Sequence, residues 1–371
     1  MSLIPLVDLQ AQHQAVADEI LHGWQQVLGQ TAFIGGPEVA AFESEFAAFT
    51  GARHCVGVAN GTDAIEIALR ALGVGPGDEC VLPANTFVAT AEAVYRTGAK
   101  PVLVDCADDG TYLMATEAVE AAVTDRTRAI IPVHLYGQTA PVERVLPLAE
   151  QIGAWVVEDA AQAQGARRHG ISAGNLAHAA ATSFYPGKNL GAYGDAGAVM
   201  TGSDDLAARM RMIRDHGSPQ KYEHQVPGLN SRLDTLQAVV LSAKLRRLAD
   251  WNAARREAAS RYDAMLSDLP DVLLPRTLDG NEHVWHLYVI RVPDRDRILK
   301  ELHAAEIGAG IHYPVPIHLT PAFAGLGYPP GAFPNSEIAA DQILSLPLFA
   351  EISPEQQMRV VSVLKSALSS C

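Results

Sequence analysis

Between about residues 52 and 202, short apolar runs alternate with stretches that have the pattern of amphipathic helices. Most of these runs are apolar on both alternating faces, which is what a strand covered on two sides requires. The runs are CVGVA, ECVLP, PVLVD, AIIPVHL, AWVVED, AAATSF and AGAVMTG, and the helical stretches include TDAIEIALRALG, VATAEAVYRTG and PVERVLPLAEQIG. This repetition predicts a mostly parallel, right-handed α/β sheet. The last runs have no long helix between them, so an antiparallel strand is allowed there.

The second half of the chain has a different pattern. A helical zone extends from about residue 230 to 269, and proline and glycine interrupt the sequence after it. A strand (HVWHLYVIRV), a helix (RDRILKELHAAE), a loop (PVPIHLTPAF) and a closing helix (EQQMRVVSVLKSALSS) are predicted in turn. The 371 residues suffice for two domains. We expect a large domain over residues 1–250, N-terminal segment included, and a smaller C-terminal domain over 251–371.

The composition excludes some classes of partner. A formal net charge of −14 argues against general binding of nucleic-acid backbones, which needs a basic face. No apolar run approaches the roughly 18 residues that a membrane span needs. The start of the chain, MSLIPLVDLQAQHQ, has neither the basic leader nor the apolar core of a signal peptide. We therefore expect a cytoplasmic protein that binds neither nucleic acid nor membrane.

Polar residues follow several of the predicted strands, at the edge of a parallel sheet where ligands bind. After CVGVA comes NGTDA, in which Gly61 allows a tight turn and Thr62 can cap the next helix. The free N–H groups of such a helix start suit a phosphate. After AWVV, either Glu158 or Asp159 should face the crevice, because neighbouring residues on a strand alternate faces. Taken alone, each motif is as typical of a helix cap or a salt bridge as of a ligand site.

Lys188 lies in the loop of SFYPGKNLGAYGDAG, downstream of Ser183 at the end of another predicted strand. A phosphate-binding P-loop would need glycine at 182 and serine or threonine at 189, where the chain has Thr182 and Asn189. The remaining interpretations are a lysine that forms a Schiff base and a solvated surface lysine. A phosphate cradle, an acidic residue and a lysine are together what pyridoxal phosphate (PLP) requires. Phe87, in PANTFVAT, is placed either to cover the ring of this cofactor or to pack in the core.

The sequence resembles the DegT–DnrJ–StrS family of PLP-dependent sugar aminotransferases over nearly its whole length, from IPLVDL to LSLPLF. The most specific markers are NGTDA, EDAAQA, SFYPGKNLGAYGDAGA, GLNSRLDTLQA and HYPVPIHL. The resemblance implies the aspartate aminotransferase-like fold (fold type I), in which a large domain with a mostly parallel seven-stranded sheet carries a smaller C-terminal α+β domain. It also implies a homodimer with shared active sites.

The same resemblance implies a role for individual residues. Lys188 would form the Schiff base with PLP and move protons, Asp159 would pair with the ring nitrogen, and Gln162 would bond the ring hydroxyl. Gly61, Thr62 and Ser183 would hold the phosphate, and Phe87 would stack on the ring. Asn230 would reach the phosphate bound in the neighbouring subunit. The residues implied to line the sugar pocket are Tyr185, His312, Tyr313 and His318.

The implied reaction transfers an amino group from L-glutamate, through pyridoxamine phosphate, to a nucleotide-linked keto-deoxysugar. The stretch HGSPQKYEHQVPGLNSRLDTLQA is more similar to members that aminate C-3 of a dTDP-linked 3-keto-6-deoxyhexose than to those acting at C-4. A dehydratase branch has histidine in place of the Schiff-base lysine, so Lys188 favours transamination. His312 and His318 are separated by prolines and have no cysteine beside them, so no metal site is expected.

Two other interpretations stay open. The first is a PLP enzyme with another substrate, either a C-4 keto-sugar nucleotide or an amino acid or amino-cyclitol. The second is a non-catalytic regulator that keeps the fold as a ligand sensor. The presence of both Lys188 and Asp159 favours an enzyme over a regulator.

Overall fold

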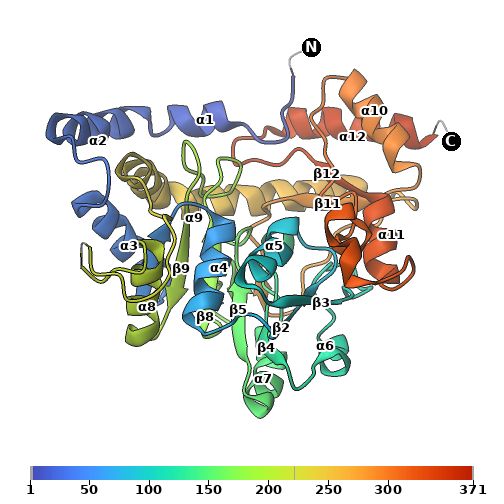
Figure 1. Cartoon of the computed structure of the whole chain (residues 1–371). Helices are drawn as coiled ribbons and strands as arrows, with labels where there is room; N and C mark the ends of the chain where they lie inside the picture. The colour runs from blue at the N-terminus through green and yellow to red at the C-terminus, as the bar shows by residue number, and fades with distance from the viewer. Residues whose placement is uncertain (1–2, 221, 370–371) are drawn as a thin grey trace.

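The computed structural model describes residues 3–220 and 222–369, and its main sheet has seven strands within these residues (Figure 1). Their order across the sheet is β1-β9-β8-β5-β4-β2-β3. Their bounds are β1 His54–Val58, β2 Glu79–Pro83, β3 Lys100–Val104, β4 Thr127–Ile130, β5 Trp155–Asp159, β8 Ala179–Ser183 and β9 Gly197–Thr201. β9 is antiparallel to both of its neighbours, and the other pairs are parallel. The predicted mostly parallel sheet, with its antiparallel strand among the last runs, is confirmed.

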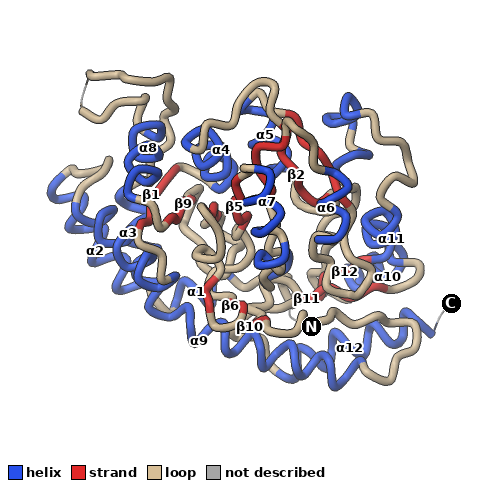
Figure 2. Tube along the Cα trace, turned by 90° about the horizontal axis from the view of Figure 1, so that it is seen from below, coloured by secondary structure: helices blue, strands red, loops and turns tan. Residues whose placement is uncertain are grey.

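Both faces of the sheet are covered by helices. One face carries α4 (Gly61–Ala71), α5 (Val88–Thr97) and α8 (Asp204–Arg214), and the other carries α3 (Pro37–Thr50), α6 (Thr116–Ala122), α7 (Leu146–Ile152) and α9 (Thr235–Leu266). In β9, Val199 packs in the first core, whereas Ala198 and Met200 pack against α3 and α9. Figure 2 shows the strands between these helix layers. Burial on both faces explains why the strands are apolar at nearly every position.

The 32-residue helix α9 links the sheet to the C-terminal part of the chain. Its first half packs on α3 and on α2 (Ala17–Gln30). Its last turns belong to another core, formed with α10 (Arg295–Ala304), α12 (Pro354–Ser369) and the strand pair β11 (Tyr288–Arg291) and β12 (Ile343–Leu346). Ile4 packs in this second core and pairs with Ile307. Because α9 passes residue 250 without a break, the division into 1–250 and 251–371 stays a prediction.

Several elements carry no clear signal in the sequence. They are α1 (Leu9–Gln14), α11 (Pro334–Gln342), the small sheet of β10 (Asn281–Glu282), β6 (Arg167–Arg168) and β7 (Ile171–Ser172), and the 3₁₀ turns Leu135–Gly137, Val142–Arg144, Ile317–Leu319 and Pro321–Leu326. The strand expected over 283–292 is shorter than expected, because β11 begins at Tyr288. Its earlier residues bond the 3₁₀ turn after β4 instead, through Val284 N to Gly137 O (2.9 Å).

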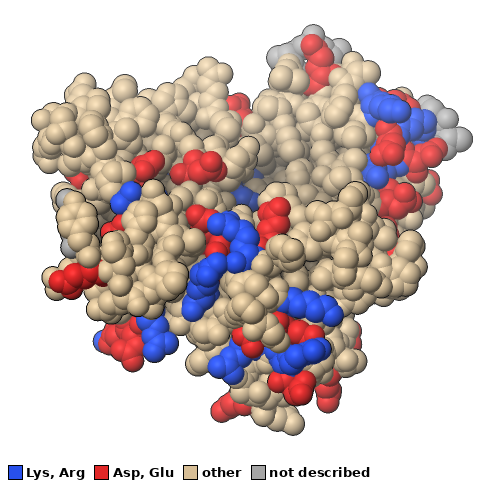
Figure 3. All heavy atoms as spheres, viewed as in Figure 1, with Lys and Arg blue, Asp and Glu red and all other residues tan. Residues whose placement is uncertain are grey.

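The distribution of charges and the state of the cysteines are those of an ordinary globular protein. On the face in Figure 3, Lys and Arg side chains are interspersed with Asp and Glu. Cys55, Cys80 and Cys106 are buried free thiols. Neither part of the described chain, 3–220 or 222–369, contains a helix with the length and apolarity that a bilayer crossing needs.

Gly197, the first residue of β9, lies where this strand passes closest to the start of α4. An added Cβ there would lie 2.5 Å from the carbonyl carbon and oxygen of Asn60, which are backbone atoms. We expect Gly197→Ala to lower the free energy of unfolding by about 1–3 kcal/mol, as overpacking does, and urea unfolding measures it. Gly202→Ala is the matched control, because no atom lies within 4 Å of a Cβ at that position. Equal stability of the two variants would contradict the prediction.

Candidate active site

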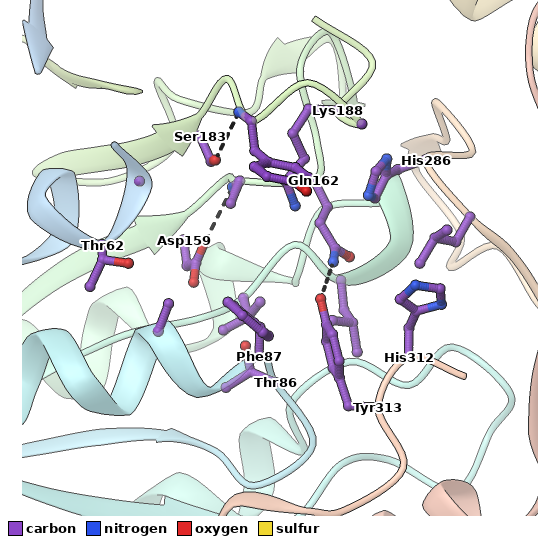
Figure 4. A pocket seen from close by; sticks show the side chains of 18 of the residues that line it. Thr62, Thr86, Phe87, Asp159, Gln162, Ser183, Lys188, His286, His312 and Tyr313 are labelled. Carbon is purple, nitrogen blue, oxygen red and sulfur yellow. Dashed lines mark hydrogen bonds between the residues drawn. The ribbon is translucent and has the colours of Figure 1, made fainter. Parts of the chain in front are cut away.

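A cavity of about 550 Å³ opens at the carboxyl ends of β1, β5 and β8. This volume is typical of a site for a small molecule. Figure 4 shows the side chains that line it, drawn from elements far apart in the sequence. Ten of the residues predicted from the sequence line this cavity, namely Gly61, Thr62, Phe87, Asp159, Gln162, Ser183, Tyr185, Lys188, His312 and Tyr313.

Lys188 sits in the loop between β8 and β9, and its side chain points into the cavity (Figure 4). The loop is tightly folded, since Lys188 N donates to Tyr185 O (2.9 Å) and a Cβ on Gly191 would lie 2.2 Å from Pro186 O. Burial lowers the pKa of the Lys188 amine to about 8, against the opposing effect of the Asp159 carboxylate. The amine therefore gives up its proton far more readily than an exposed lysine does.

Asp159 and Glu158, the last two residues of β5, face opposite ways. Asp159 lines the cavity, where its carboxylate accepts hydrogen bonds from Thr90 Oγ1 (2.7 Å) and Ala161 N (3.1 Å). Glu158 is fully buried on the other face and lies 2.8 Å from His134 Nε2. The sequence-based expectation that one carboxylate faces the crevice and the other the packed core is confirmed.

The start of α4 forms one end of the cavity. Asn60 is the N-cap of this helix, since its Oδ1 accepts from Asp63 N (2.8 Å). The expectation that Thr62 caps the helix is therefore wrong: Thr62 is already inside the first turn, where its side chain lines the cavity. A Cβ on Gly61 would lie 2.6 Å from Ser183 Cβ, so only glycine lets the helix start approach the end of β8 this closely. The first N–H groups of a helix have no partner within it, and they attract an anion.

A hydrogen-bonded pair lies deeper in the cavity. Gln162 accepts through Oε1 from Tyr136 N (2.6 Å) and donates through Nε2 to the Tyr313 hydroxyl (3.0 Å). The half-exposed ring of Phe87 lies 5.1 Å from the ring of Tyr313 and forms part of the wall. Tyr185 is exposed at the mouth. These contacts fix the Gln162 amide in one orientation.

Two histidines line the cavity, and only His312 was predicted. His312 Nδ1 lies 2.8 Å from Ser345 Oγ, and burial, with a smaller effect of Lys188, lowers the pKa of His312 to about 4. His286 is buried in the same wall, and burial followed by the charge of Lys188 holds its pKa well below the usual value. Its only signal in the sequence is a polar residue inside the apolar run HVWHLYVIRV. Both imidazoles are neutral at physiological pH.

Two predicted residues do not line this cavity. The His318 ring is buried elsewhere, with Nε2 2.9 Å from Glu337 Oε1 and the ring nearly perpendicular to that of Phe333. Asn230 is exposed and pairs with Asp215 outside the cavity, so its role toward a neighbouring subunit stays a prediction. Lys221, in the stretch used to distinguish C-3 from C-4 members, lies outside the described residues.

The family model described as the DegT/DnrJ/EryC1/StrS aminotransferase family matches residues 14–365. The chain belongs to this family. A relative named erythromycin biosynthesis sensory transduction protein EryC1, from Saccharopolyspora erythraea, is 47% identical over 98% of this chain and 99% of its own length. A dTDP-3-amino-3,4,6-trideoxy-α-D-glucose transaminase from Streptomyces venezuelae is 45% identical over 98% of this chain and 95% of its own length.

A crystal structure of DesV from Streptomyces venezuelae, in complex with a ketimine intermediate, superposes with a TM-score of 0.96. DesV is 44% identical to this chain, and the alignment covers 99% of this chain and 98% of the DesV chain. The fold is thus that of the PLP-dependent aminotransferases, and the chain is an enzyme of this class.

The cofactor of this class is PLP, and the cavity fits it. An anion cradle at the start of α4, a carboxylate held by two donors and an amine of lowered pKa meet in one cavity. In the described residues, no group of three or more His, Cys, Asp or Glu side chains could hold a metal ion.

The balance of charge at Lys188 predicts a titration. In cofactor-free enzyme, the rate at which an amine-reactive reagent labels Lys188, read by mass spectrometry of the peptide, should rise with pH around a midpoint near 8. In Asp159→Asn the midpoint should move lower, because the carboxylate stabilises the ammonium form. A wild-type midpoint near the ordinary lysine value of 10.5 would contradict the lowered pKa of Lys188, and an upward shift in the variant would contradict the effect of Asp159 on it.

Proposed function

We propose that this enzyme transfers an amino group from L-glutamate to C-3 of a dTDP-linked 3-keto-6-deoxyhexose. One observation carries the proposal: the low-pKa amine of Lys188, the carboxylate of Asp159 and the start of α4 line the same cavity. Support for a nucleotide sugar and for C-3 comes from the Streptomyces venezuelae relative, whose name specifies a dTDP-3-amino sugar. The similarity of residues 216–238 to C-3 members adds to this support.

The proposal gives each residue of the cavity a binding role. Asp159 would hold the protonated ring nitrogen of PLP and Gln162 its ring hydroxyl, with Phe87 against the ring face. The phosphate would lie on the free N–H groups at the start of α4, with the side chains of Thr62 and Ser183 beside it. When bound, PLP supplies an aldehyde that takes up amines and a ring that delocalises the electrons left when a neighbouring carbon loses a proton.

Lys188 would move the protons. Its Nζ would carry a proton from the glutamate carbon that bears the amino group to the cofactor, and in the second half of the reaction it would carry a proton from the cofactor to the sugar carbon. A pKa of about 8 suits both directions, because near neutral pH the amine is mostly protonated yet reaches its neutral form far more readily than an ordinary lysine. His312 and Tyr313 would face the sugar, since they line the cavity away from Thr62 at the start of α4 (Figure 4), and Tyr185 would do so from the mouth.

We also propose a homodimer with shared sites. The N-terminal segment exposes an unusual number of large apolar side chains, which are Leu9, Leu21, Leu28, Phe33 and Ile34. Figure 3 shows few charges over α1 and α2, the helices that carry the first three. A second copy of the chain packed on this surface would remove these apolar side chains from water. Asn230, exposed and outside its own cavity, would then reach the phosphate end of the neighbouring subunit's cavity.

The substrate is tested with a panel of nucleotide sugars. Purified enzyme, L-glutamate and matched 3-keto and 4-keto sugar nucleotides are incubated, and NMR identifies the aminated carbon. We expect amination at C-3, and Lys188→Ala should lose both turnover and the absorbance change of the cofactor on adding glutamate. Amination at C-4, turnover with 2-oxo acids alone, or activity in Lys188→Ala would each refute part of the proposal.

The shared site predicts complementation between two inactive variants. Lys188→Ala and Asn230→Ala should each have low activity alone, and mixed dimers formed by co-expression should recover activity. Recovery is expected because a mixed dimer contains one cavity with both native residues. Size-exclusion chromatography with light scattering checks the dimer. If mixing restores nothing while Asn230→Ala alone is inactive, the residue acts within its own subunit.

A further inference from the structure

His286 lies in the wall of the cavity, and none of the roles proposed above uses it. It belongs to the segment between β10 and β11 and is buried. Its Nδ1 lies 3.3 Å from Oδ1 of Asn189, the residue that follows Lys188. The side chain is therefore attached to the loop that carries the catalytic lysine.

The contacts of Asn189 determine which nitrogen of His286 carries the proton. The Nδ2 of Asn189 donates to the backbone carbonyl oxygen of Val284 (2.9 Å) and to Oδ1 of Asn252 (2.9 Å). A backbone carbonyl can only accept, so this end of the Asn189 amide must be the NH₂ group. The other end, Oδ1, must then accept, and its neighbour His286 Nδ1 must donate. His286 is thus the tautomer protonated on Nδ1.

The other nitrogen, Nε2, is left as a free acceptor. Burial and the charge of Lys188 keep the pKa of His286 well below its usual value, so a second proton is not gained. In the described chain, no residue donates a hydrogen bond to Nε2. A neutral imidazole with an unpaired acceptor, in the wall of the cavity, is available to accept a hydrogen bond from a ligand donor.

We propose that His286 Nε2 accepts a hydrogen bond from a hydroxyl group of the keto-sugar and so contributes to substrate specificity. This inference rests on the proposed function. A sugar offers several hydroxyl donors, whereas the carboxylates of glutamate are acceptors that a lone pair repels. The one donor of glutamate is the amino group that is transferred. His286 therefore acts in the half-reaction with the sugar and not in the half-reaction with glutamate.

Two substitutions separate the two nitrogens of the ring. His286→Asn places an amide near the position of Nδ1, so the bond to Asn189 can be kept while the Nε2 acceptor is lost. His286→Gln reaches further and places an amide oxygen near the position of Nε2. Both variants are first checked for unchanged melting temperature and cofactor absorbance, which shows that they fold and load.

The two half-reactions are then measured separately by stopped-flow absorbance of the cofactor. In His286→Asn, we expect kcat/KM for the keto-sugar to fall by about 10–100-fold, the range for one lost hydrogen bond to a neutral group. The glutamate half-reaction should be unchanged, and His286→Gln should recover part of the loss. Parallel loss in both half-reactions would show that His286 positions Lys188 instead, and no loss in either would show that Nε2 contacts no substrate. Both results overturn the inference.

The proposed function and this inference fail in different ways. If wild-type enzyme aminates none of the keto-sugar nucleotides, the proposed function is wrong, whatever the variants do. The tautomer is tested independently by ¹⁵N NMR of histidine-labelled enzyme, with His286→Asn used to assign the signals. The two-bond couplings should show a proton on Nδ1, and a proton on Nε2 would overturn the inference with any substrate.

Discussion

The proposed chemistry of this enzyme depends on one electrostatic balance at the carboxyl edge of the sheet. Burial lowers the pKa of Lys188 to about 8, and the Asp159 carboxylate acts in the opposite direction. Burial alone would lower the pKa of the amine further, and the carboxylate alone would raise it. The balance comes from topology, because Asp159 ends β5 and the loop with Lys188 follows its neighbour β8. Strand order brings the two groups together although 29 residues separate them in the chain.

The position of Lys188 is also supported from outside the sheet. Asn189 is bonded to Asn252 on α9, and a second residue of α9, the buried Lys244, donates to Gly191 O (2.7 Å). The loop is therefore held at two points just after Lys188 by the helix that joins the two cores of the molecule. Burial lowers the pKa of Lys244 to about 8 as well. The contact of α9 with the loop therefore includes a desolvated amine, whose burial is unfavourable in itself.

The features predictable from the sequence are those with a local cause. A strand buried on both faces must be apolar throughout, and ligands bind where parallel strands end, so the sheet and the cavity residues at the strand ends could be predicted. Gln162, Tyr185, His312 and Tyr313 were predicted only from the resemblance to the family. The alternation of side chains also separated Glu158 from Asp159. Long-range contacts were not predictable. The strand expected to contain His286 starts later because Val284 bonds the turn after β4 instead, and His318 turns away from the cavity to meet Glu337.

Under the proposed function the cavity accepts two unlike substrates in turn, and the two ends of the cavity differ in their electrostatics. The start of α4 offers a positive helix end, which suits an anion that stays bound throughout the reaction. The wall with His286 and His312 is neutral, because burial lowers both pKa values. A neutral wall neither holds nor repels an anionic amino donor such as the proposed glutamate strongly, so selection there depends on the direction of hydrogen bonds. That direction is set at His286 by Asn189, beside the lysine proposed to move the protons, so any shift of this loop would change catalysis and recognition together.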